Sequence, residues 1–73
     1  MNNAFKNTSK KHKYTDYCTC FYVPEKNIVV FYDEIKERPI EKQAVKGGKE
    51  ADIVMRIWQD NAPESVICQI LKD

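Results

Sequence analysis

YTDYCTCFYVPEKNIVVFYD, which spans residues 14–33, is the densest run of β-branched and aromatic side chains in the chain. These residue types favour β-strands, and the turn-forming segment Pro24-Glu25-Lys26-Asn27 divides the run into two halves. The stretch therefore predicts a β-hairpin with a loop over residues 24–27.

Pairing about this loop sorts the hairpin side chains into two faces. One face receives the pairs Val23 with Ile28, Phe21 with Val30 and Thr19 with Tyr32, and the other receives Tyr22 with Val29 and Cys20 with Phe31. Both faces are apolar, whereas a strand that buries one face alternates apolar with polar residues. We therefore expect the hairpin to lie in the centre of a sheet or to use its second face for an interaction.

The charged segment 34–46 follows the hairpin and contains Pro39. Residues 40–46 fit either a polar third strand or a short helix that begins at Pro39. We favour an edge strand, because charged side chains protect sheet edges and proline is tolerated at the start of a strand.

Gly47-Gly48 then ends this element, and residues 49–60 place Ile53, Val54, Ile57 and Trp58 at helical spacing. Glu50 and Asp52 add acidic residues to the first turn, where they favour helix formation. This pattern predicts an amphipathic helix over residues 49–60.

Residues 64–73 fit a second helix or a closing strand. We favour the strand, because Ser, Val, Ile and Cys dominate the segment and Val66, Cys68 and Ile70 lie at alternate positions, although short apolar runs fit both patterns. The predicted order is β-β-β-α-β. The fold class is α+β, a small meander β-sheet with one amphipathic helix packed on one face, in a single domain over residues 14–73.

Residues 1–13 carry Lys6, Lys10, Lys11 and Lys13, no acidic residue and little apolar content, and we expect a disordered basic arm there. The arm holds four of the twelve basic residues and none of the eleven acidic ones, so residues 14–73 carry a net charge of −3. The sequence contains no run of about 18 apolar residues and no apolar signal segment, which predicts a cytoplasmic protein with no membrane partner.

The three cysteines predict reduced thiols, because their number is odd and no export signal accompanies them. Cys18 and Cys20 lie two residues apart on a strand, where side chains run parallel, unlike the converging C-x-x-C pair of zinc sites. We predict no metal and no cofactor. His12 is the only histidine and lies in the arm, so no fixed base would activate a cysteine, and we expect that the protein is not an enzyme.

The leading functional hypothesis is a small non-enzymatic interaction module, a regulator, inhibitor or assembly subunit that binds a protein partner or forms a homodimer. Its predicted binding residues share one hairpin face, where hydroxyl groups tolerate water: Tyr17, Thr19, Phe21, Val30 and Tyr32. The other face, with Cys20, Tyr22, Val29 and Phe31, is predicted to meet the helix through Ile53, Ile57 and Trp58. Small proteins of this kind are frequent among phages and mobile elements, although no motif here points to such a source.

The alternative is a nucleic-acid-binding accessory protein that uses Lys10, Lys11 and Lys13 of the arm. Strand aromatics could stack on bases. The negative net charge of residues 14–73 argues against this alternative, because a basic groove supplies most non-specific affinity for nucleic acid.

Overall fold

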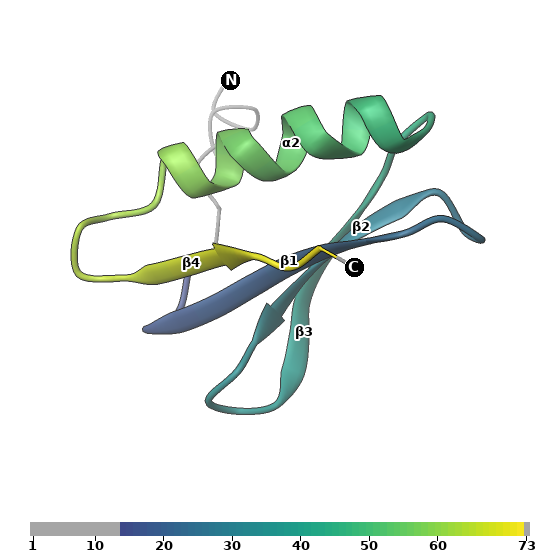
Figure 1. Cartoon of the computed structure of the whole chain (residues 1–73). Helices are drawn as coiled ribbons and strands as arrows, with labels where there is room; N and C mark the ends of the chain where they lie inside the picture. Colours follow the sequence, from purple (N-terminus) through teal and green to yellow (C-terminus); the bar gives the residue numbers. More distant parts are fainter. Residues whose placement is uncertain (1–13, 73) are drawn as a thin grey trace, which may run out of the picture.

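The computed structural model describes residues 14–72. Its elements are β1 (Tyr17–Val23), β2 (Ile28–Asp33), β3 (Arg38–Ala44), α2 (Gly48–Asp60) and β4 (Ile67–Ile70). The sheet has the order β3-β2-β1-β4, in which β1 to β3 form an antiparallel meander and β4 runs parallel to β1. The helix α2 lies along one face of this sheet (Figure 1). The predicted α+β fold and its β-β-β-α-β order are confirmed, whereas the predicted arm lies outside the described residues.

The hairpin of β1 and β2 has the predicted register, from Val23 opposite Ile28 to Thr19 opposite Tyr32. Its loop is closed by a bond from the Lys26 N–H to the Val23 carbonyl at 3.2 Å. Asn27 adopts a positive φ of 52°, which asparagine tolerates better than most residues. The two strands are the central strands of the sheet, which is one of the two predicted arrangements. This position pairs both edges of each strand but does not cover either face.

The strand β3 begins two residues before the predicted range of 40–46. The turn before it is held by Asp33, whose Oδ1 accepts bonds from the N–H groups of Ile35 at 2.9 Å and Lys36 at 3.1 Å. Burial alone would raise the pKa of Asp33, but the N–H groups of Lys36 and Ile35 outweigh it and hold that pKa below its ordinary value. Most β3 side chains are exposed, as expected for an edge strand.

The helix α2 matches its predicted range to within one residue. Gly47 offers no side chain to cap the helix, and Glu50 Oε1 instead accepts a bond from the Lys46 N–H at 2.7 Å. A carboxylate near the first turn also interacts favourably with the helix dipole.

The predicted inward face of α2 is wrong for two of its three residues. Trp58 is buried, but Ile53 is 56% exposed and Ile57 is 50% exposed. The helix instead buries Ala51 and Met55. Trp58 stacks on Phe31 with ring centroids 3.5 Å apart. This contact sets the rotation of the helix so that Met55 and Ala51, three and seven residues before Trp58, face the sheet.

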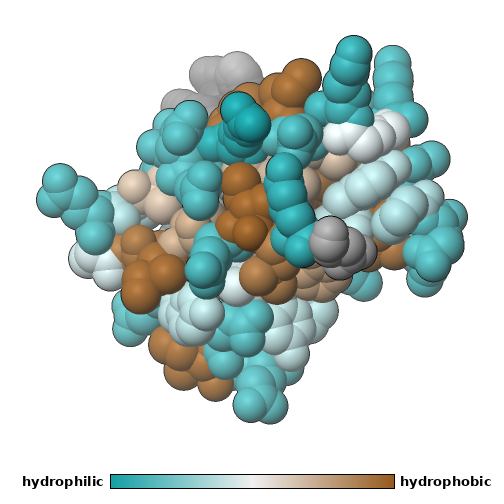
Figure 2. Space-filling model, in the orientation of Figure 1, coloured by the Kyte–Doolittle hydropathy of each residue, from teal (hydrophilic) through white to brown (hydrophobic). Residues whose placement is uncertain are grey.

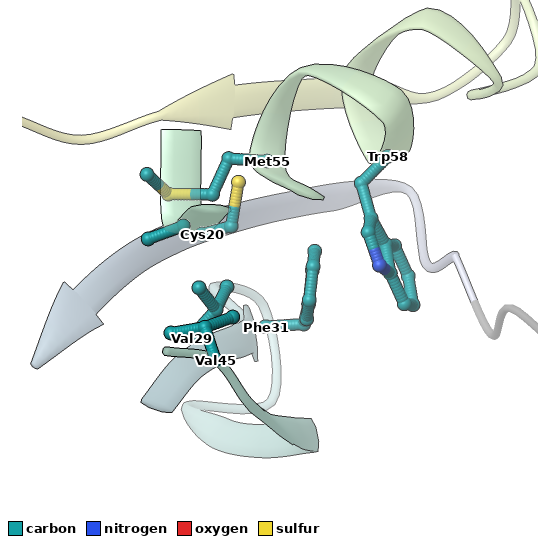
Figure 3. Packing of buried hydrophobic residues seen from close by; sticks show 7 residues of the cluster. Cys20, Val29, Phe31, Val45, Met55 and Trp58 are labelled. Carbon is teal, nitrogen blue, oxygen red and sulfur yellow. The ribbon is translucent and has the colours of Figure 1, made fainter. Parts of the chain in front are cut away.

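The core lies between α2 and the sheet face that bears Cys20, Val29 and Phe31, as predicted. Met55 and Trp58 extend from the helix toward these side chains (Figure 3). Tyr14 closes one end of the core: its ring packs edge-on against Trp58 at 5.2 Å, and its hydroxyl donates to the Trp58 carbonyl at 2.7 Å. Tyr14 thereby joins the segment that precedes β1 to the last turn of α2.

The closing segment forms the strand β4, and the strand interpretation of residues 64–73 is confirmed over Ile67–Ile70. Backbone bonds from Ile67 N–H to the Asp16 carbonyl at 3.0 Å and from Leu71 N–H to the Cys20 carbonyl at 2.8 Å hold it against β1. Within residues 14–72, no helix has the length and apolar character needed to cross a membrane.

Candidate functional site

The sheet face opposite α2 is here called the outer face. Cross-strand register places on it the alternate residues of β1, β2 and β4, among them Tyr17, Thr19, Phe21, Val30, Tyr32 and Ile67. Within residues 14–72 the only helix covers the other face of the sheet, so no helix covers the outer face (Figure 1). The structure thus brings all five predicted binding residues together on one surface.

These five residues differ in exposure. Thr19 is only 1% exposed and Val30 only 7%, so both lie beneath their neighbours. Tyr17 is 36% exposed, while Phe21 and Tyr32 are half-buried. The contact surface is therefore formed mainly by the three aromatic side chains.

Ile67 enlarges this surface and was not among the predicted residues. It is 59% exposed and lies directly opposite Tyr17 in the β1–β4 register. The sequence signals an apolar residue at this position, but its placement beside Tyr17 depends on the parallel pairing of two strands that are far apart in the chain.

Polar groups on the outer face carry both signs of charge. The Thr19 hydroxyl donates to Glu34 Oε2 at 2.9 Å, which holds this carboxylate over the sheet. Lys42 lies opposite Val30 on the neighbouring strand and supplies a positive charge. A surface with both signs suits a protein partner better than a polyanion. Lys10, Lys11 and Lys13, the residues of the nucleic-acid hypothesis, lie outside the described residues.

The three cysteines gather on the helix-covered side of β1 and β4. Cys18 lies opposite Cys68, Cys20 is fully buried, and all three are free thiols. Burial, and to a smaller extent the neighbouring Cys18 thiol, raises the pKa of Cys20 to about 11. Burial, and to a smaller extent the neighbouring Cys18 and Cys20 thiols, raises the pKa of Cys68 to about 12. At neutral pH these two thiols are protonated and therefore poorly nucleophilic.

Among residues 14–72, no three or more histidine, cysteine, aspartate or glutamate side chains are arranged so that they could hold a metal ion. Cys18 and Cys20 are buried among the core residues, while Cys68 is partly buried.

An open hollow of about 680 Å³ lies between α2 and the end of β1, beyond the last residue of β4. Its lining is mainly apolar and consists of Phe21, Tyr22, Pro24, Gly48, Ala51, Asp52, Met55, Leu71 and Lys72. An exposed ion pair of Lys72 and Asp52, 3.6 Å apart, lies at the same place. The hollow adjoins the outer face through Phe21. Figure 2 shows apolar patches separated by hydrophilic side chains on the side of the molecule seen in Figure 1.

Comparisons with protein-family models, with curated proteins and with solved structures give no match. The function is accordingly argued from the geometry of the surface.

Proposed function

We propose that this protein is a small non-enzymatic interaction module that binds a protein partner through the aromatic outer face of its sheet. The observation that carries the proposal is the contrast between the two faces. The helix α2 buries one face around Phe31, while Tyr17, Phe21, Tyr32 and Ile67 lie on the other without a helix over them in residues 14–72.

Aromatic side chains favour such a role. Tyrosine combines a large apolar area with a hydroxyl that tolerates water in the free protein, and it is enriched at the centres of protein interfaces. The buried Thr19 and Val30 support the aromatic residues from beneath, so the surface is held in place before a partner arrives. A surface that needs no rearrangement loses less entropy on binding.

The thiols support the non-enzymatic part of the proposal. An active-site cysteine has a lowered pKa, whereas burial raises the pKa of Cys20 to about 11 and that of Cys68 to about 12. Their environment is that of structural cysteines.

Affinity capture with the immobilised full chain tests the proposal, with parallel captures that include nuclease. We expect one protein partner whose recovery nuclease does not change. Replacement of both Tyr17 and Tyr32 by Ala should weaken capture by about 1 kcal/mol or more in binding free energy.

Ile53→Ala combined with Ile57→Ala is the matched control, because these exposed apolar residues lie on α2, away from the outer face. Capture should survive this change. Recovery that nuclease abolishes, and that is lost when Lys10, Lys11 and Lys13 are replaced by Gln, would instead support the nucleic-acid hypothesis.

A further inference from the structure

The outer edge of β4 presents backbone groups that no other strand of residues 14–72 pairs with. Ile67 and Leu71 direct their N–H groups toward β1, where they bond to carbonyls at 3.0 Å and 2.8 Å. Because strand residues alternate in direction, Cys68 and Ile70 direct their N–H and C=O groups away from β1. The bond from Gln59 Nε2 to the Cys68 carbonyl at 3.0 Å is consistent with this direction.

The two edges of the sheet differ in their protection. At the β3 edge, Pro39 lacks an N–H and the exposed Arg38, Glu41 and Lys42 are charged, and these are the usual devices against edge pairing. The strand β4, with the sequence ICQI, has neither a charge nor a proline. Among residues 14–72, the β4 edge is therefore less protected against pairing with another strand than the β3 edge.

Apolar side chains accompany this open edge. Ile67 is 59% exposed and Leu71 is 44% exposed. Lys72, which follows Leu71, forms an ion pair with Asp52 at 3.6 Å, so these two charges compensate each other. An approaching strand would gain apolar contacts with Ile67 and Leu71.

We propose that β4 pairs in antiparallel orientation with β4 of a second copy of this chain, which forms a two-fold symmetric dimer with one continuous sheet. In the register that fits the free backbone groups, Cys68 of one copy lies opposite Ile70 of the other, and the two residues exchange both N–H···O bonds. The Cys68 carbonyl can keep its bond to Gln59, because a carbonyl oxygen accepts twice.

The same register explains the exposed apolar residues. It places Ile67 of each copy opposite Leu71 of the other, and it places Gln69 opposite its own symmetry mate. An uncharged strand can meet an identical strand without opposing like charges, and a two-fold interface requires this self-complementarity. These features favour a second copy over a charged peptide strand.

This inference concerns the edge of the sheet and does not depend on the proposed role of the outer face. Sedimentation equilibrium of the full chain, under reducing conditions, measures the dimer. Gln69 is exposed, and Gln69→Lys or Gln69→Glu would place like charges opposite each other at the two-fold axis. Each variant should weaken dimerisation about tenfold or more. An equimolar mixture of the two should dimerise again, because opposite charges then meet at the axis.

Ala44→Lys is the matched control, since it adds the same charge to an exposed position of the other edge strand and should leave the dimer intact.

Amide hydrogen exchange at Cys68 and Ile70 should slow as protein concentration rises. The inference is overturned if the chain stays monomeric up to millimolar concentration, or if Gln69→Lys and Gln69→Glu each dimerise normally. It is also overturned if Tyr17→Ala with Tyr32→Ala disrupts the dimer while Gln69→Lys does not. A strand peptide from another protein that protects these amides in a monomeric chain would also overturn it.

Discussion

The two faces of the sheet are both rich in apolar residues, but only one of them is covered by α2. Alternate residues of the same two strands supply Cys20, Val29 and Phe31 to one face and Thr19, Phe21 and Tyr32 to the other. The helix α2 closes the first face. On the second face, which no helix of residues 14–72 covers, Thr19 is nevertheless buried, and its hydroxyl donates to Glu34 in the turn after β2. Apolar character alone therefore does not say which face becomes the core; the position of the helix decides it.

The largest expected effect is the loss of stability on Phe31→Ala. Phe31 is 1% exposed and stacks on Trp58, so truncation removes a core contact and leaves a cavity. The expected cost is about 3–5 kcal/mol of unfolding free energy, a large share of the stability of a small domain. Denaturant unfolding measures it. Phe21→Ala, on the half-buried opposite face, is the control and should cost less; equal losses would remove the distinction between the two faces.

The second prediction compares a buried residue of α2 with an exposed one. Met55→Ala should cost about 2–4 kcal/mol because Met55 is 4% exposed and packs in the core. Ile57→Ala, at a position that is 50% exposed, should change stability by only about 0.5 kcal/mol. Thermal or denaturant midpoints of the two variants provide the test. A larger loss for Ile57→Ala would show that the helix is rotated toward the face predicted from the sequence.

The sequence predicted the hairpin register because residues 24–27 form a short loop that fixes which residues face each other. It predicted the existence and range of α2 because the apolar periodicity and the Gly47-Gly48 break agree. It did not predict the rotation of the helix, since the branched Ile53 and Ile57 carry more hydrophobic signal than Ala51. The stacking of Trp58 on Phe31 decides the rotation, and this contact joins residues far apart in the chain.

The sequence predicted only part of the candidate surface. The shared face of Tyr17, Phe21 and Tyr32 follows from strand alternation, which is local. The hydrogen bond of the buried Thr19 hydroxyl requires Glu34, which lies in the turn after β2, and the position of Ile67 depends on parallel pairing with β1. Such contacts cannot be derived from the spacing of residues within a single strand.

The third prediction concerns the thiols on the helix-covered face. Cys20 and Cys68 have pKa values raised to about 11 and about 12, above the ordinary value of 9.0, so the folded state favours the protonated form. Their contribution to stability is complete below about pH 9 and is lost as the pH rises through the folded values. At pH 8, iodoacetamide should modify both thiols much more slowly in the folded protein than in denaturant. Equal rates would contradict the burial of these cysteines.

The last prediction concerns the outer face, where Tyr17→Ala is expected to cause only a small loss of stability. Tyr17 is 36% exposed, and its hydroxyl donates to Gln69 Oε1 at 3.2 Å in a solvent-accessible position. Water replaces such a bond readily, so the variant should lose no more than about 1 kcal/mol of unfolding free energy. Tyr32→Ala should cost somewhat more, because Tyr32 is half-buried opposite Thr19. Denaturant midpoints of both variants, measured beside Phe31→Ala, rank the two faces directly. If the tyrosine variants unfold the protein while Phe31→Ala leaves it folded, the outer face is the structural one, and the proposed binding surface loses its basis.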